Sequence, residues 1–241
     1  MKTLVLGTAL LAFGAGAAFA ESHSVVRMGT EGAYPPYNFI NDSGEVDGFE
    51  RELGDELCAR AELTCEWVTN DWDSIIPNLV SGNYDTIIAG MSITDERREQ
   101  IDFTQNYTLP DPSAYVALTG AEVDYTGGVI AAQANTIQAA HVAEAGATLL
   151  EFATPDETIA AVRNGEADAV LADKAYLEPI AAENDDIAFT GEEVLIGDGI
   201  GLGLRKSDTE LKEKFNAAIQ SMKDDGSLNE LIAKWEIGAG F

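Results

Sequence analysis

Hydrophobic positions along the chain fall into short runs with two different spacings. Runs of alternating or continuous apolar residues predict strands, and runs in which apolar residues recur every three to four positions predict helices. In the first half these elements follow one another in the order strand 25–29, helix 49–60, strand 63–69, helix 74–80 and strand 84–89. This alternation is typical of an α/β fold whose mostly parallel strands are joined by right-handed crossovers.

The second half carries three patterns that mark the start of a helix. Each pairs a Ser or Thr N-cap with a Glu three positions later: Thr154 with Glu157, Ser207 with Glu210, and Ser227 with Glu230. They predict a helix that ends at residues 164–165, followed by a buried strand over 167–172, and two closing helices over 208–225 and 228–235.

One helix–strand unit occurs twice. Residues 75–89 and 158–172 match when shifted by 83 positions, and each reads as helix, glycine, short turn, Asp and apolar strand. The repeat favours two similar lobes, with a chance match between common units as the alternative. Ligands of open α/β sheets bind beyond the carboxyl ends of the strands. Those ends, residues 90–92 and Asp173, would both contact a ligand held between the lobes.

Two connecting segments predict a hinge between these lobes. They are residues 109–112, which contain two prolines, and the glycine-rich residues 197–203. Two crossings imply that the closing helices pack back on the first lobe. The expected boundaries are a first lobe over 21–110, a second lobe over 111–197 and a return to the first lobe over 198–241.

The charge of the chain excludes several functions. Asp plus Glu number 42 against 14 Lys plus Arg, for a formal net charge of -28 over 241 residues. Such a chain does not hold nucleic-acid phosphates or an anionic membrane surface by electrostatics. With two His and two Cys, we expect no metal centre and no cofactor. Most of the acidity suits adaptation to a saline environment, and attraction of cationic ligands is the functional alternative.

The first twenty residues predict a cleaved signal peptide. One Lys precedes an apolar, small-residue run that ends in Ala18-Phe19-Ala20, the form that signal peptidase cuts after. A membrane anchor is the alternative, for which the run is marginally long. Export to an oxidising compartment favours a disulfide between Cys58 and Cys65, whose spacing is not that of a CxxC redox motif.

Several segments carry a resemblance to a known family. The most specific is Ser92-Ile93-Thr94 with the arginines that follow it, and the others are residues 29–39, 48–53, 101–107, 167–173 and 201–206. Together they resemble the periplasmic substrate-binding proteins of polar amino-acid ABC transporters, which include lysine/arginine/ornithine, histidine and opine binders. The resemblance covers residues 25–237, and Cys58 and Cys65 fall where the lysine/arginine/ornithine type has its disulfide.

The resemblance implies a type II periplasmic-binding-protein fold with two lobes, each a mostly parallel sheet flanked by helices. It implies a periplasmic, monomeric protein that closes on a free amino acid and delivers it to an ABC permease in the inner membrane. Two other classes stay open. A dehydratase-like enzyme on this fold would need an acid or base near the ligand, and His23 and His141 lie outside the motifs. The third possible class is the ligand-binding module of a sensor.

The resemblance also implies how the backbone groups of an amino acid are held. Arg97 would pair with the carboxylate through its planar fork, unless it forms a surface ion pair with Glu96 or Glu99. Asp173 would accept the ammonium, unless it caps the following helix. Further hydrogen bonds are expected from Gly90, Ser92 and the N–H groups near Thr136 and Ile137, at a helix N-terminus.

The side-chain end of the site predicts a cationic ligand. Tyr34 and Trp72 fall where the family sandwiches the ligand side chain between aromatic rings, with packing in the core as the alternative. Glu31 and Glu50 fall where basic-amino-acid binders place acidic residues. Arginine, lysine or ornithine is therefore the expected ligand, and an opine or another modified or neutral amino acid is the alternative.

Overall fold

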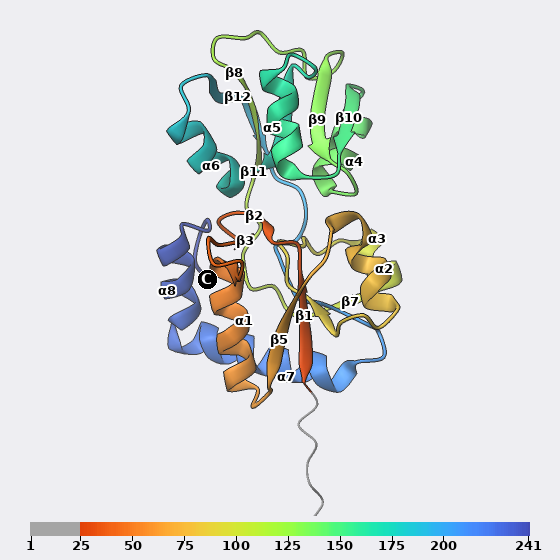
Figure 1. Ribbon diagram of the computed structural model, residues 1–241, viewed down its shortest axis with the longest axis vertical. Coiled ribbons are helices and arrows are strands. Elements are labelled where there is room, and N and C mark those ends of the chain that lie inside the picture. The colour runs from red at the N-terminus through yellow and green to blue at the C-terminus, as the bar shows by residue number, and fades with distance from the viewer. Residues whose placement is uncertain (1–24) are drawn as a thin grey trace, which may run out of the picture.

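The computed structural model describes residues 25–241, so the predicted signal peptide at residues 1–20 lies outside the described residues. The chain forms two lobes stacked along the long axis of the molecule, each built around one five-stranded sheet (Figure 1). The predicted α/β fold with two sheets flanked by helices is confirmed. No helix within residues 25–241 has the length and apolar character needed to cross a membrane.

The first lobe contains the sheet of order β5-β1-β6-β13-β7. β1 runs parallel to β5 and β6, whereas β13 runs antiparallel to β6 and β7. The strands are β1 (Val26–Thr30), β5 (Cys65–Thr69), β6 (Thr86–Ile87), β7 (Asp102–Phe103) and β13 (Gly203–Leu204). A small antiparallel sheet beside it consists of β2 (Ala33–Tyr34), β3 (Asn38–Ile40) and β4 (Val46–Asp47).

The second lobe contains the sheet of order β10-β9-β11-β8-β12. β9 lies between β10 and β11 and is parallel to both, and β8 pairs antiparallel with β11 and β12. The strands are β8 (Ser113–Leu118), β9 (Val129–Gln133), β10 (Thr148–Phe152), β11 (Ala169–Asp173) and β12 (Ile187–Val194).

Helices flank both sheets (Figure 1). Those of the first lobe are α1 (Phe49–Arg60), a 3-10 turn (Trp72–Ser74), α2 (Ile75–Val80), α3 (Asp95–Gln100), α7 (Thr209–Asp225) and α8 (Ser227–Trp235). Those of the second are α4 (Ile137–Ala145), α5 (Pro155–Arg163) and α6 (Lys174–Glu183). The predicted spacing on α1 is confirmed, because Phe49, Leu53 and Leu57 are fully buried in the core.

The chain passes between the lobes twice. It leaves the first lobe after β7 to enter β8, and it returns from β12 to β13. The closing helices lie against α1, where Arg60 donates to Ser221 Oγ at 2.9 Å and to Asp225 Oδ2 at 2.7 Å. The first lobe is therefore built from two separate stretches of sequence.

The start of α1 is set by a glycine. Gly48 has φ 117°, and a Cβ there would lie 2.6 Å from the carbonyl oxygen of Tyr37 and 2.9 Å from that of Pro36. The same two carbonyls accept the first N–H groups of the helix, from Glu50 at 2.8 Å and Phe49 at 3.0 Å. The carbonyls that approach Gly48 so closely that only glycine fits there also bond the first turn of the helix. They thereby fix the position of Glu50.

The three predicted capping boxes have different outcomes. At Thr154 the box is confirmed, with both the Thr154 and the Glu157 side chains bonding the opposite backbone N–H. The predictions of capping boxes at Ser207 and Ser227 are wrong. α7 follows Asp208 with no side-chain cap, and the Ser207 hydroxyl bonds Asp208 instead. Ser227 is already the first residue of α8, because Gly226 in the left-handed region both ends α7 and precedes α8.

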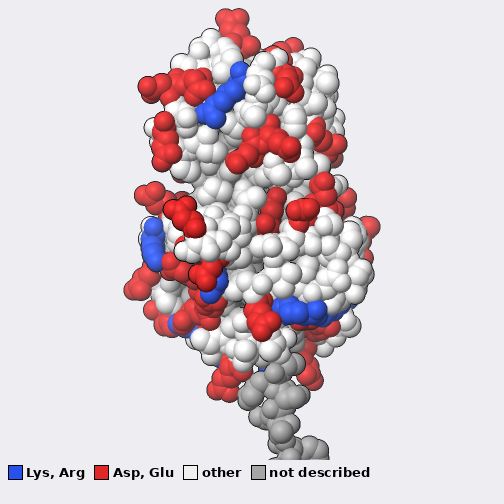
Figure 2. Space-filling model, viewed as in Figure 1, with Lys and Arg blue, Asp and Glu red and all other residues white. Residues whose placement is uncertain are grey.

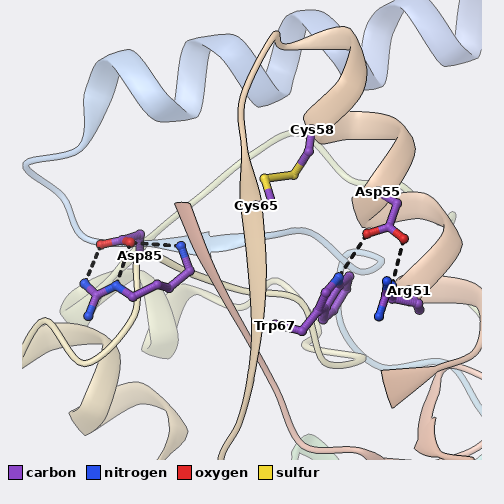
Figure 3. Close-up of a disulfide and its surroundings, with 7 residues drawn as sticks. Arg51, Asp55, Cys58, Cys65, Trp67 and Asp85 are labelled. Carbon is purple, nitrogen blue, oxygen red and sulfur yellow. Dashed lines mark hydrogen bonds and ion pairs between the residues drawn. A yellow bond between two sulfur atoms is a disulfide. The ribbon is translucent and has the colours of Figure 1, made fainter. Parts of the chain in front are cut away.

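The predicted disulfide is confirmed. Cys58 near the end of α1 is bonded to Cys65 at the start of β5, with 6.3 Å between their Cα atoms (Figure 3). Beside it, Asp55 of α1 accepts from Trp67 Nε1 of β5 at 3.0 Å and from Arg51 at 2.7 Å. The covalent bond and these contacts together hold the helix against the edge strand of the first sheet.

Acidic side chains are spread over both lobes on the face drawn in Figure 2, with basic side chains scattered among them. The acids do not gather on one lobe or at the boundary between the lobes in that view. This distribution fits a generally solvated acidic surface better than a field directed at one cleft.

Candidate functional site

A pocket lies between the two lobes. Nine of the ten residues predicted to bind ligand line it, and Glu50 does not. The lining residues are Glu31, Tyr34, Trp72, Ala89, Gly90, Ser92, Arg97, Gln133, Thr136, Ile137, Gln138 and Asp173. Both predicted strand ends, the segment after β6 and the end of β11, therefore meet at one site.

Arg97 is buried in the pocket wall and forms no surface ion pair with Glu96 or Glu99. Its side chain donates to the carbonyl oxygen of Ser92 at 2.8 Å and, across the lobes, to that of Asn135 at 3.2 Å. The guanidinium carbon lies 5.3 Å from the centre of the Trp72 ring. Burial lowers the pKa of Arg97 to about 10, so the group remains a cation at neutral pH and can pair with a carboxylate.

Asp173 occupies the N-cap position of α6, but its side chain does not cap the helix. One carboxylate oxygen accepts from Tyr34 Oη at 2.8 Å and the other from Gln138 Nε2 at 3.0 Å. Burial raises the pKa of Asp173 to about 6, although the hydrogen bond from Tyr34 opposes the rise. Asp173 is thus ionised at neutral pH and placed to accept an ammonium group.

The N-terminus of α4 opens on the pocket, as predicted. Thr136 is its N-cap and accepts from Ala139 N, and Ile137 is the first helical residue. Asn135, just before them, has φ 60°, a left-handed conformation that Asn tolerates better than most residues. This bend turns the Asn135 carbonyl toward Arg97 and leaves the first N–H groups of α4 as the positive end of a helix dipole.

The two predicted aromatic residues both line the pocket. Trp72 and Tyr34 are both buried, with 8% and 9% of their surfaces exposed. The Tyr34 ring is stacked on Tyr176 of the second lobe, with 4.4 Å between ring centres and 9° between the planes. At most one face of Tyr34 is therefore free for a ligand, and the sandwich between Tyr34 and Trp72 stays a prediction.

Glu31 forms the acidic end of the pocket together with Gln133. The Gln133 amide donates to Glu31 Oε1 at 2.6 Å and to the Ala153 carbonyl at 3.0 Å. Burial raises the pKa of Glu31 to about 7, and the carboxylates of Asp71 and Asp73 add to the rise, while the Gln133 hydrogen bond lowers it. Near neutral pH, Glu31 is therefore divided between its neutral and ionised forms.

Glu50 lies beneath the pocket and not in its wall, which corrects the prediction that it faces the ligand. The side chain is fully buried, and its carboxylate accepts from Asn38 Nδ2 at 2.7 Å, from Gly90 N at 2.6 Å and from the Tyr107 hydroxyl. Gly90 itself lines the pocket. The physical reason is that α1 starts behind the strand end, so its second residue points at the backbone of Gly90.

Three lining residues were not predicted from the sequence: Ala89, Gln133 and Gln138. Gln133 ends β9, next to β11, and the rule that ligands meet the carboxyl ends of strands was sufficient to find it. Gln138 sits in the first turn of α4 and donates to both Asp173 and Ser113 Oγ. No motif marked it, because its role depends on which strand end the helix faces.

Four hydrogen-bonded pairs of residues join the lobes around the pocket. They link Tyr34 to Asp173, Glu31 to Gln133, Arg97 to Asn135, and Asp73 to Asn135, the last at 3.2 Å. Among residues 25–241 no group of three or more His, Cys, Asp or Glu side chains could hold a metal ion. The pocket combines one cation, two carboxyl groups, aromatic rings and helix N–H groups, which is the chemistry that a zwitterion requires.

These features define a two-lobed protein that holds a small zwitterion between its lobes. A family model described as bacterial extracellular solute-binding proteins, family 3, matches residues 26–239, and the chain belongs to this family. It is 33% identical to the L-arginine-binding protein of Pseudomonas aeruginosa over 226 residues, covering 87% of each chain. It is 31% identical to the lysine/arginine/ornithine-binding periplasmic protein of Escherichia coli, covering 98% of this chain and 97% of that protein.

Solved structures show the same fold. A periplasmic His/Glu/Gln/Arg/opine family-binding protein from Silicibacter pomeroyi, solved in complex with lysine, is 70% identical with a TM-score of 0.87, covering 90% of this chain and 100% of that one. An ancestral arginine-binding protein bound to arginine is 31% identical with a TM-score of 0.81, covering 88% and 97%. The predicted resemblance is confirmed.

Proposed function

We propose that this protein captures a free cationic amino acid, such as arginine, lysine or ornithine, between its lobes. The charge balance of the pocket carries the proposal. Arg97 matches the ligand carboxylate and Asp173 matches its ammonium, which leaves Glu31 as an uncompensated acid for a cationic side chain. Two relatives are named as binding proteins for arginine and for lysine, arginine and ornithine, which supports the same ligand class.

A neutral ligand such as glutamine is the second candidate. The raised pKa of Glu31 leaves this group partly protonated near neutral pH, and a protonated carboxyl can donate to a side-chain amide. An ancestral arginine-binding protein was also solved with glutamine. An opine fits less well, because it carries further carboxylates and Arg97 is the only Lys or Arg among the described lining residues.

The biological setting is part of the proposal. We propose a periplasmic monomer that delivers its ligand to an ABC permease, exported by a signal peptide cleaved after Ala20, and that performs no chemistry on the ligand. The family and the periplasmic relatives support this setting. The proposed lobe boundaries near residues 110 and 197 are supported by the start of β8 at Ser113 and the end of β12 at Val194.

Calorimetric titration of the protein, freed of bound ligand by unfolding and refolding, tests the proposal. The panel is arginine, lysine, ornithine, histidine, glutamine, glutamate, octopine and nopaline. We expect arginine, lysine or ornithine to bind most tightly and glutamate to give no heat, because its side chain would face Glu31. Tightest binding of glutamine or an opine would retain amino-acid capture and reject the cationic preference.

Two adjacent arginines give a matched test of the site. Arg97→Ala should weaken binding at least ~100-fold, since it removes the charge-assisted partner of a buried carboxylate. Arg98→Ala is the control. Arg98 is exposed, and it pairs loosely with Asp102 at the surface, with 3.8 Å between the charged atoms. We expect Arg98→Ala to stay within about twofold of the wild type. Equal losses in the two variants would reject Arg97 as the carboxylate partner.

A further inference from the structure

Glu50 collects hydrogen bonds from three separate parts of the first lobe. Its oxygen Oε1 accepts from both Gly90 N, in the pocket wall, and the Tyr107 hydroxyl. Its oxygen Oε2 accepts from Asn38 Nδ2 of β3. Three donors thus converge on one fully buried side chain that does not itself reach the pocket.

A carboxylate is the group that this convergence requires. An ionised carboxylate has only acceptors, whereas the amide of Gln would place an NH₂ group against one of the three donors. No Lys or Arg of the described residues pairs with Glu50, so its partners are the neutral donors alone. Burial raises the pKa of Glu50, and the three hydrogen bonds oppose the rise.

Tyr107 connects Glu50 to the crossing between the lobes. It lies six residues before Ser113, the first residue of β8, and its backbone N–H donates to the carbonyl of Ile200 at 2.7 Å. Ile200 belongs to the segment that returns from the second lobe, and it also pairs with Thr108 in an antiparallel bridge. Tyr107 therefore sits where the outgoing and returning segments are joined.

Asn38 extends the same set of bonds to the acidic end of the pocket. While its Nδ2 group donates to Glu50, its Oδ1 atom accepts from Gly32 N at 2.7 Å. Gly32 directly follows Glu31, so the turn that carries this pocket residue is bonded to Glu50 through one side chain. Asn38 is fully buried, and both ends of its amide are satisfied by these two contacts.

We infer that Glu50 is a positioning residue that fixes the Gly90 backbone in the pocket wall and couples it, through Tyr107, to the hinge. The ligand-binding part of this inference rests on the proposed function. Because Glu50 acts on backbone and hinge, its loss should weaken cationic and neutral ligands by the same factor. Glu31, in contrast, lies in the wall and should discriminate between them.

Tyr107→Phe tests the coupling, with Tyr84→Phe as a matched control. Both tyrosines are fully buried in the first lobe, and the Tyr84 hydroxyl bonds the Ile75 carbonyl, away from the hinge. Both variants lose one buried hydrogen bond, and Tyr107→Phe should lose more thermal stability because its bond is to a carboxylate. We expect Tyr107→Phe to weaken arginine and glutamine equally, about fivefold, and Tyr84→Phe to weaken neither beyond about twofold.

A second measurement does not depend on any ligand. Spin labels at Ser81→Cys and Glu144→Cys, both exposed and one in each lobe, report the distribution of distances between the lobes. Without ligand, Tyr107→Phe and Glu50→Gln should broaden this distribution, and Tyr84→Phe should match the wild type. An unchanged distribution in Tyr107→Phe, or affinities equal to those of Tyr84→Phe, would overturn the coupling. Failure of the wild type to bind any panel amino acid would reject the proposed function alone.

Discussion

Arg97 and Arg98 show how one position along a short helix changes the use of the same side chain. Arg97 is 9% exposed and bonds two carbonyls in the pocket, whereas the Arg98 side chain is 44% exposed and pairs loosely with Asp102. Thr94 caps α3 by accepting from Arg97 N. The cap fixes the start of the helix, and so decides which arginine turns toward the second lobe.

The ionisation of Glu31 predicts a pH dependence that differs between ligands. Below its pKa of about 7 Glu31 is neutral, and above it the carboxylate attracts a cationic side chain. Lowering the pH from 8 to 6 should therefore weaken arginine binding relative to glutamine binding about tenfold. Titration calorimetry at both pH values measures the ratio of the two dissociation constants.

Two features of this pH test isolate Glu31. Asp173, with a pKa of about 6, faces the ammonium group that all amino acids share, so its protonation cancels in the ratio. Glu31→Gln should bind arginine more weakly at pH 8 and make the ratio independent of pH. A ratio that still falls tenfold in Glu31→Gln would assign the titration to another group.

At this scale the sequence predicted the pocket residues that lie in family motifs. Arg97, Asp173 and Glu31 were found because the segments that contain them resemble those of the family, and their charges suit the groups of an amino acid. Glu50 was predicted to face the ligand, but it faces the backbone of Gly90. A sequence motif does not distinguish these two orientations of an acidic side chain. Gln133 was missed because no strand was predicted over residues 129–133, so the rule on strand ends was not applied there.

At the scale of elements, the start of α1 is the most constrained point of the first lobe. A Cβ at Gly48 would meet two backbone carbonyls, in a φ region that only glycine adopts readily. Gly48→Ala should therefore lower the free energy of unfolding by about 3 kcal/mol or more. Urea unfolding followed by far-ultraviolet circular dichroism measures the loss.

Gly44→Ala provides the comparison for this loss. Gly44 also has a positive φ, 79°, but a Cβ there meets nothing within 4 Å. We expect it to cost about 1 kcal/mol, the penalty of a left-handed Ala alone. If both variants lost the same amount, steric contact at Gly48 would not be the reason for its glycine.

Element boundaries could be predicted where local chemistry sets them, as at α1 and at the capped start of α5. Boundaries that depend on contacts between distant segments could not be predicted. β6 is only Thr86–Ile87, shorter than the apolar run over residues 84–89, because β1 and β13 pair with it over those two residues. The capping box predicted for α8 failed for a related reason, since Ser227 accepts from Arg60 of α1 instead.

For the whole molecule, the net charge of -28 predicts a salt dependence of stability. Like charges spread over both lobes repel one another in the compact state, and salt screens this repulsion. Raising NaCl from about 0.05 to 1 M should raise the melting temperature by roughly 4–8 °C, for a gain of about 2 kcal/mol. Differential scanning calorimetry measures the shift.

Sucrose of equal osmolality is the control for the salt series. It stabilises proteins by exclusion from their surface and does not screen charge, so its effect should be smaller than that of NaCl. An equal rise in both series, or a fall with NaCl, would show that charge repulsion does not limit the stability of this fold.

The division of the first lobe between two stretches of sequence has a consequence for the order in which the molecule is completed. A chain that emerges amino-terminus first has every strand of the second sheet once residue 194 has appeared. The first sheet, although it begins at Val26, lacks the strand that joins β6 to β7 until residues 203–204 follow. The lobe that starts first is thus finished last, and α7 and α8 are its final step of assembly.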